Sequence, residues 1–178
     1  MILPSNFELN MYGLFIRFVN ESDARFIVDL RKEQRARFLK QTSSNISHQE
    51  KWISQYKERE YKGTDYYLIY YVDGEPVGVN RIHNIQKDSF ISGSLVFKSS
   101  CEFDVPLKAT LIAFYIGFEL LDKSVSFGNI NKQNVRAIKF NRILGGDFVY
   151  SSDTEEYFVL TKKTYLLLKS KLANTTFG

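Results

Sequence analysis

A histidine on a predicted strand is the clearest candidate for proton-transfer chemistry in this sequence. His83 follows Arg81 by two residues in a run rich in Val and Ile, which is typical of a β-strand. Alternate side chains of a strand share a face, so both are expected on the same side of the sheet. Imidazole titrates near neutral pH and can accept a proton directly or through water. A structural histidine at the end of the strand is the alternative interpretation.

Two asparagines follow the short strand predicted at 125–128. Asn131 and Asn134 could direct their carboxamides into a gap between neighbouring parallel strands, where such sheets bind ligands. They could equally cap the helix predicted from Asn134 to Leu144, since asparagine is a good N-cap residue. The single cysteine, Cys101, excludes an intramolecular disulfide and a cysteine-rich zinc site, and no metal site is expected.

The elements that would position these side chains alternate between helical and strand-like patterns. Predicted helices begin at Asn20–Asp23, at a capping box formed by Ser47 and Glu50, at Asp104–Pro106 and at Asn134. Gly145 and Gly146 would end the last of these. Predicted strands occupy 14–19, 66–72, 76–85, 90–97, 125–128, 148–151 and 157–161. A hairpin turn is expected at Asp73–Gly74. Residues 1–11 would form a loose lead-in, and 162–178 a C-terminal helix or tail.

Length and composition favour one domain, residues 1–178, of the α/β or α+β class. The chain has 178 residues, is 44% hydrophobic and carries a net charge of +4. This balance is typical of a globular domain, and the mild basicity does not indicate nucleic acid as a partner. No apolar run of about 18 residues predicts a membrane span, and the N-terminus lacks a signal-peptide pattern, so a cytoplasmic protein is expected. Hairpin-linked strands followed by strand–helix–strand crossovers predict a mixed, mostly antiparallel sheet flanked by helices.

The order of these elements and three segments resemble the GNAT superfamily of N-acetyltransferases. Residues 131–146 contain an asparagine pair, Ala-Ile-Lys-Phe and Leu-Gly, and look like the family motif that follows the fifth strand. Leu30-Arg31 and the segment Ser47–Trp52 look like the bacterial branch that includes aminosugar and ribosomal-protein acetyltransferases. The resemblance covers about residues 13–161. It implies a splayed cofactor cleft between neighbouring parallel strands.

The resemblance also implies an activity, in which acetyl-CoA is the co-substrate and a primary amine attacks it directly. His83 would be the base, Asn141 stands where many family members place a tyrosine acid, and Arg31 and Arg81 would bind the acceptor. The residues expected to bind the cofactor are Val96, Phe97, Lys98, Ser99, Ser100, Cys101, Lys108, Asn131, Asn134 and Phe140. The expected acceptor is an aminosugar nucleotide, and a ribosomal protein or a protein N-terminus is the alternative. An exposed hydrophobic edge would support a homodimer.

One segment departs from the family pattern. The family opens its long central helix with a glycine-rich loop whose backbone amides cradle a pyrophosphate, whereas residues 98–106 contain no glycine. Pro106 lacks an amide donor, and Glu102 and Asp104 place negative charge where phosphates would bind. Either backbone amides near Ser99–Cys101 bind the cofactor by another route, or the chain is a non-catalytic binding module of the same fold.

Overall fold

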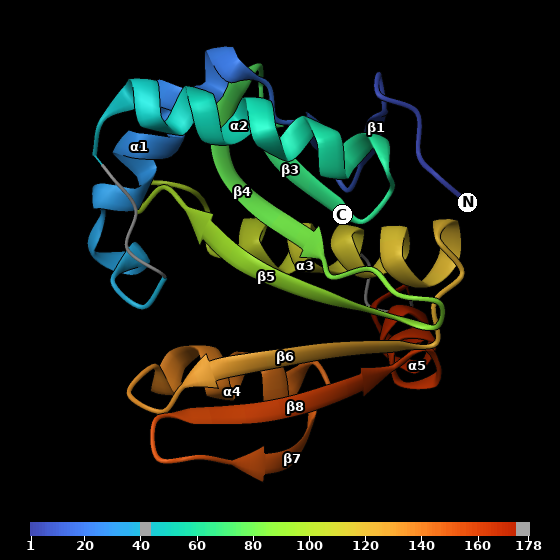
Figure 1. Ribbon diagram of the computed structural model, residues 1–178. Coiled ribbons are helices and arrows are strands. Elements are labelled where there is room, and N and C mark those ends of the chain that lie inside the picture. Colours follow the sequence, from blue (N-terminus) through green and yellow to red (C-terminus); the bar gives the residue numbers. More distant parts are fainter. Residues whose placement is uncertain (40–43, 174–178) are drawn as a thin grey trace.

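A computed structural model describes residues 1–39 and 44–173, whose strands form one eight-stranded sheet (Figure 1). The strands are β1 (Glu8–Met11), β2 (Leu14–Phe18), β3 (Asp65–Val72), β4 (Glu75–His83), β5 (Ser89–Phe97), β6 (Val125–Asn131), β7 (Asp147–Ser151) and β8 (Glu155–Thr161). Their order across the sheet is β1-β2-β3-β4-β5-β6-β8-β7. β5 and β6 run parallel, whereas the other neighbours are antiparallel. The expected mixed, mostly antiparallel sheet is confirmed.

Helices cover both faces of this sheet (Figure 1). The helices are α1 (Ala24–Lys32), α2 (Ile46–Tyr61), α3 (Val105–Tyr115), α4 (Val135–Ile143) and α5 (Lys162–Ala173). α1 and α2 lie on one face of β3, β4 and β5, and α3 lies on the other. α3 continues as a π-helical turn at Ile116–Leu120. α4 crosses β6 and β8 on the same side as α3.

Strand β3 shows how the sequence pattern builds two cores. Its side chains alternate between the faces, and Tyr66, Leu68 and Tyr70 pack toward α3. Tyr67 and Ile69 pack toward α1 and α2. All five are at most 1% exposed. Burial on both faces explains why this strand is a continuous apolar run instead of an alternating one.

Two turn signals in the sequence are confirmed by backbone angles. Asp73 and Gly74 have φ values of 49° and 81°, the left-handed pair that a two-residue hairpin turn requires. Gly145, with a φ of 88°, follows the end of α4 as the left-handed residue that stops the helix. These turns set the register of β3 with β4 and the path from α4 into β7.

Three local expectations were wrong. Residues 1–11 are not a loose lead-in, because Glu8–Met11 pairs with β2 and the Leu3 amide donates to the Tyr66 hydroxyl at 3.0 Å. α2 begins one residue before Ser47, and Asn45 caps it by accepting from the Ser47 amide at 2.9 Å. β6 continues past Gly128 to Asn131. At the C-terminus α5 covers 162–173, and the remainder of the expected helix or tail lies outside the described residues.

No helix in 1–39 or 44–173 is long and apolar enough to cross a membrane. Within the same residues, no group of three or more His, Cys, Asp or Glu side chains is arranged to hold a metal ion.

Candidate active site

β5 and β6 diverge along their length (Figure 1). Residues of both strands line a cleft at this place. Three residue pairs join the two strands, from Ser89–Val125 to Ile91–Phe127. Beyond Ile91, β5 pairs with β4 while β6 pairs with β8. The backbone edges of β5 and β6 therefore face a gap, in the position that the sequence resemblance implied.

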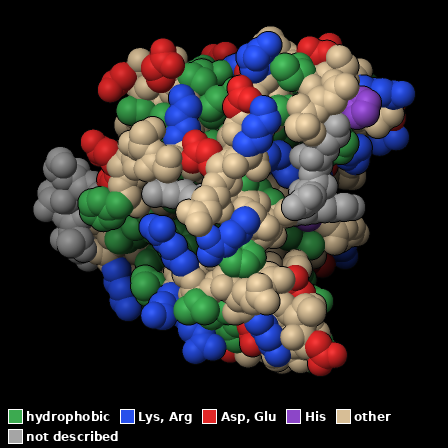
Figure 2. Space-filling model, turned by 90° about the vertical axis from the view of Figure 1, so that its left-hand side faces the viewer, with side chains coloured by type: hydrophobic (Ala, Val, Ile, Leu, Met, Phe, Trp, Pro, Cys, Tyr) green, Lys and Arg blue, Asp and Glu red, His purple; other side chains and the backbone are tan. Residues whose placement is uncertain are grey.

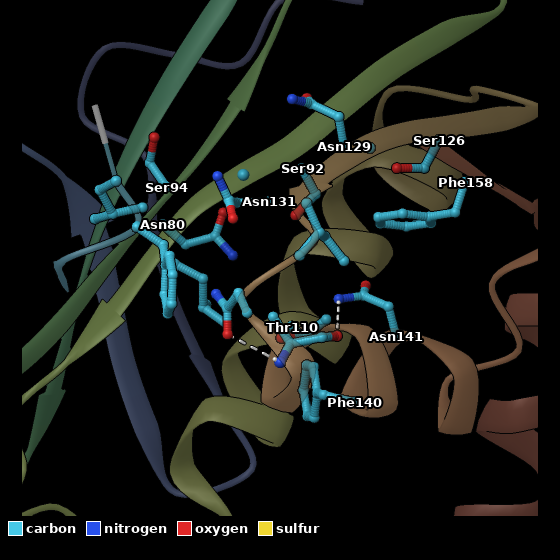
Figure 3. Close-up of a pocket in the computed structure, with 18 of the residues that line it drawn as sticks. Asn80, Ser92, Ser94, Thr110, Ser126, Asn129, Asn131, Phe140, Asn141 and Phe158 are labelled. Atoms are coloured by element: carbon cyan, nitrogen blue, oxygen red, sulfur yellow. Dashed lines mark hydrogen bonds between the residues drawn. The ribbon is translucent and has the colours of Figure 1, made fainter. Parts of the chain in front are cut away.

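A bulge in β5 lies at the edge of this gap. Arg81 pairs with Gly93 and Val79 pairs with Val96, so β5 has one residue more than β4 between these pairs. Ser94, inside the bulge, has a φ of 53°, a left-handed conformation that is costly for a residue with a Cβ atom. Bulges redirect side chains beside functional sites, and this one places Ser94 in the wall of the cleft (Figure 3).

The inner part of the cleft, which we call the inner cavity, has a volume of about 480 Å³. Uncharged polar side chains contribute much of its wall. Those from the strands and α3 are Asn80, Ser92, Ser94, Thr110, Ser126, Asn129 and Asn131 (Figure 3). Phe114, Phe140 and Phe158 form its apolar wall. Such a mixture of apolar surface and a few convergent polar groups is typical of a small-molecule site.

Asn80 is an unsatisfied polar residue in this wall. The side chain is 1% exposed, and its Oδ1 atom has no hydrogen-bond partner among the residues that the structure describes. A buried carbonyl without a partner costs about 1–3 kcal/mol. A bound ligand that donates a hydrogen bond would remove that cost.

A second space, the outer cavity, continues from the inner one and has a volume of about 580 Å³. The two share the wall residues Phe38, Leu95, Asn134, Ala137 and Phe140. Val96, Phe97 and Pro106 give the outer cavity apolar surface. Its basic lining residues are Arg37, Arg136 and Lys139. Figure 2 views the molecule from the end where β5 and β6 terminate, and Lys and Arg side chains gather on that face.

The end of β6, the N-cap of α4 and α4 itself bring four of the predicted site residues to the inner cavity. Asn131, Asn134, Phe140 and Asn141 all line it. The carboxamide oxygen of Asn134 accepts from the Ala137 amide at 3.2 Å, and that of Asn131 accepts from the Gln133 amide at 2.9 Å. Asn134 therefore caps α4 while its Nδ2 group is not committed to the cap. Asn141 Nδ2 donates to the Ala137 carbonyl at 2.9 Å, which leaves its oxygen as an acceptor.

The glycine-free loop before α3 does not line either cavity with its predicted residues. Lys98, Ser99, Ser100, Cys101 and Lys108 are absent from both described walls. Cys101 instead packs against the core beside α3. The Lys108 ammonium pairs with Asp104 at 2.8 Å, and Lys98 lies over the Phe26 ring at 5.4 Å. Both lysines thus have local partners.

The Ser99 amide, which was expected to face a phosphate, has an internal acceptor. It donates to the Glu33 carboxylate at 2.8 Å. Glu33 follows the end of α1, and 66 positions separate the two residues. A carboxylate thus already satisfies the amide and places negative charge beside it, and a contact of Ser99 with a phosphate stays a prediction.

His83 lies beside the cleft on the face that carries α1 and α2. A Cβ atom built on Gly93 would be 3.5 Å from His83 Nε2, and Gly93 itself lines the inner cavity. Burial lowers the pKa of His83 below its ordinary value, and the neighbouring Arg81 lowers it further. The imidazole is therefore neutral at pH 7, the state in which it can accept a proton.

The two predicted acceptor-binding arginines contact other parts of the protein. Arg81 forms an ion pair with the buried Asp65, and its guanidinium lies 5.1 Å from the Trp52 ring. Arg31 is half-buried beside Tyr67, and its positive charge opposes the rise in the pKa of Tyr67 that burial causes. Neither lines the described cavities. Binding of the acceptor substrate by either arginine stays a prediction.

Sequence reasoning missed several residues that line the cavities. Asn80 lies two residues before the buried Ile82 of β4, on the same face, and a polar residue there was a usable signal of a buried polar site. Arg37, Arg136 and Lys139 are ordinary surface cations in the sequence, and only the fold brings them to one cavity.

Comparison with known proteins agrees with this geometry. No protein-family model matches the chain, and no curated protein matches it. Among solved structures, apo FdhC, a nucleotide-linked sugar GNAT, has a TM-score of 0.86 and 27% identity, covering 94% of this chain and 97% of that one. Ribosomal-protein-S5-alanine acetyltransferase from Vibrio fischeri has a TM-score of 0.74 and 13% identity, covering 90% and 99%. Spermidine N-acetyltransferase from Vibrio cholerae, in complex with CoA and spermine, has a TM-score of 0.73 and 12% identity. The match covers 88% of this chain and 99% of that one.

The split sheet and these matches define the class of protein. The two Vibrio enzymes, at 12% and 13% identity, support the fold alone, and FdhC matches more closely in both structure and sequence. The chain has the fold of the GNAT superfamily, and its likeness to FdhC supports membership of that superfamily and an N-acetyltransferase activity. The resemblance seen in residues 13–161 is thereby confirmed.

Proposed function

We propose that the protein transfers an acyl group from acyl-CoA to the primary amine of a nucleotide-linked aminosugar. The observation that carries the proposal is the continuous cleft between β5 and β6, with a basic outer cavity and a polar inner one. An acyl-CoA matches these two cavities. Its anionic phosphates suit the basic outer cavity, and its thioester, at the far end of the arm, would reach the inner one. The acceptor class rests on the likeness to a nucleotide-linked sugar GNAT. Acetyl-CoA is the simplest donor of this class.

The residues fit such a co-substrate without the loop residues that sequence analysis favoured. Arg136 and Lys139 of α4, with Arg37, would bind the phosphates in the outer cavity. Val96 and Phe97 would contact the arm. The uncommitted Nδ2 group of Asn134 would donate to an amide carbonyl of the arm.

His83 would accept a proton from the incoming ammonium group, which leaves a neutral amine as the nucleophile. The amine nitrogen then forms its bond to the thioester carbonyl carbon, and the carbon–sulfur bond breaks. The sulfur leaves as a thiolate and takes up the proton that the acylated nitrogen loses, while His83 releases the ammonium proton to solvent. The free oxygen of Asn141 can accept a hydrogen bond from the resulting thiol.

Calorimetric titration with acetyl-CoA and with free CoA tests the donor half of the proposal. We expect a micromolar dissociation constant, which corresponds to about 8 kcal/mol. Release of free thiol in the presence of nucleotide-linked aminosugars, with spermidine and an alanyl peptide alongside, then tests the acceptor. Absence of binding at millimolar acetyl-CoA would favour the non-catalytic module instead. Thiol release with the peptide alone would favour a protein acceptor.

Arg136 offers a test of the outer cavity. We expect Arg136→Ala to weaken CoA binding by about 5- to 10-fold, because one charge-assisted contact to a phosphate is lost. The loss should shrink as salt is added, since the contact is solvent-exposed. Arg142→Ala is the matched control on the same helix, because Arg142 lies over Phe148 and not in the described cavity walls. Equal effects of the two substitutions, measured by titration, would contradict the assignment.

Glu33 offers a test in the opposite direction. Its carboxylate accepts the hydrogen bond of the Ser99 amide, and its negative charge would repel a phosphate in the same region. We expect Glu33→Gln to tighten CoA binding by about 2- to 5-fold, the scale of an exposed charge interaction. Weaker binding in the variant would mean that Glu33 supports the loop instead of competing with the ligand. Asp29→Asn, on an exposed site of α1, provides the control.

A further inference from the structure

We propose that Glu155 binds the ammonium group of the acceptor and so positions the amine beside His83. This role rests on the proposed function, because it assigns one residue to the acceptor amine. Among the described residues that line the inner cavity, Glu155 is the one charged side chain. The lining of the outer cavity carries basic side chains instead. Charge therefore divides the cleft into a part that suits anions and a part that suits a cation.

The Glu155 carboxylate has one polar contact with the described part of the chain and no cation beside it there. Asn129 Nδ2 donates to its Oε2 atom at 3.0 Å, whereas Oε1 has no hydrogen-bond partner among those residues. Figure 3 shows the Asn129 side chain directed away from Thr110 and Phe140, which line the far side of the cavity. Asn129 thus holds one carboxylate oxygen and leaves the other to a ligand. An ammonium group supplies a positive charge and three N–H donors.

Glu155 and His83 lie on the same face of the sheet. Directly paired residues of neighbouring strands share a face, and so do alternate residues of one strand. His83 pairs with Ile91, and Ile91 pairs with Phe127 across the seam of β5 and β6. Alternation along β6 leads from Phe127 to Asn131, which pairs with Glu155. Both side chains therefore lie on the face that carries α1 and α2.

Gly93 leaves space open between these two side chains. A Cβ atom built on Gly93 would lie 3.5 Å from His83 Nε2, its nearest contact outside the adjacent residues. At Gly78 of β4, by contrast, a Cβ atom would lie 2.2 Å from the Phe97 ring, so that glycine makes room for packing. Gly93 instead lines the inner cavity. An amine held by Glu155 can lie over Gly93 and give its proton to His83, directly or through one water.

A carboxylate at this place distinguishes the substrate from the product. A primary amine of ordinary basicity is an ammonium ion at pH 7, whereas the amide formed by acylation has no charge. Charge-assisted hydrogen bonds are about twice as strong as neutral ones. Glu155 should therefore bind the amine and lose this contact once the acyl group has been transferred, which favours release of the product.

Titration into protein saturated with free CoA measures this contact without turnover. The probe is the amine that gives the fastest thiol release among the nucleotide-linked aminosugars, spermidine and the alanyl peptide. We expect Glu155→Gln to weaken binding of that amine by at least about 10-fold, because a hydrogen bond to a charged group is lost. Binding of the purified acylated product should be unchanged. Glu155→Asp, which keeps the charge, should bind the amine more tightly than Glu155→Gln does.

Glu156→Gln is the matched control on the next residue of β8. The Glu156 carboxylate accepts from the Ser151 hydroxyl at 3.1 Å and is absent from both described cavity walls. Unchanged binding of the amine by Glu155→Gln would overturn the assignment and leave the acyl-CoA function intact. Equal weakening for amine and product would also overturn it, because that pattern indicates a structural role. Absence of thiol release with every amine would show that the proposed function itself has failed, and this role with it.

Discussion

Replacing His83 with alanine is expected to lower the turnover number by about 10²- to 10⁴-fold, the usual contribution of a general base. The imidazole lies beside Gly93, which lines the inner cavity, and its lowered pKa keeps it neutral at pH 7. Alanine cannot accept the ammonium proton, so the chemical step slows while binding of acyl-CoA persists. A steady-state assay with the acceptor, paired with titration of CoA, separates these two effects.

The pH dependence gives the same prediction a second readout. As pH falls through the pKa of His83, which lies below its ordinary value of 6.5, the imidazole becomes protonated and can no longer act as a base. The wild-type rate should therefore decline on the acid side of that value, and the His83→Ala rate should lack this limb. His48→Ala is the matched control, because His48 lies on the exposed surface of α2. Unchanged turnover in His83→Ala would return His83 to the structural interpretation.

Removal of the Asp65 carboxylate is expected to lower the free energy of unfolding by about 3–5 kcal/mol, the cost of breaking a buried ion pair. Asp65 is 3% exposed and accepts hydrogen bonds from Arg59 Nε at 3.0 Å and from the Arg81 guanidinium. Asp65→Ala leaves Arg81 partly buried without its counter-ion. Because Arg81 also lies over Trp52, the loss should disturb the packing of α2 on the sheet.

Urea denaturation measures this effect directly. Asp29 is the matched control, because it forms an ion pair with Lys32 in which both side chains are more than half exposed. Asp29→Asn should leave the denaturation midpoint essentially unchanged, since exposed pairs contribute little. A similar midpoint for Asp65→Ala and the wild type would show that the two arginines relax into solvent without cost.

The sequence predicted those elements whose structure is determined by residues close to one another in the chain. The apolar run of β3, the Asp73–Gly74 turn and the Gly145 stop depend on neighbouring residues, and each is confirmed. β1 depends on pairing with β2, so Glu8–Met11 carries little signal by itself. The capping box at Ser47 failed because Asn45 offers an equally good cap two residues earlier.

The candidate site was less predictable, because its decisive contacts join distant segments. The α4 motif placed Asn134 and Asn141 correctly in the wall of the inner cavity, although their roles stay predictions. The carboxylate of Glu33 on the Ser99 amide joins two parts of the chain with no shared pattern. The unpaired oxygen of Asn80 depends on what surrounds it in space, and no spacing rule reveals a missing partner.

The brief pairing of β5 with β6 has a mechanical consequence. Three residue pairs form the seam between the five-stranded part of the sheet, β1–β5, and the three-stranded part, β6–β8. Beyond Ile91, a change in the gap between the two strands breaks no ladder hydrogen bond between them. The gap can therefore change in width without loss of a ladder hydrogen bond, while the seam keeps the two parts aligned. Ligands of different thickness can enter and leave without melting either part of the sheet.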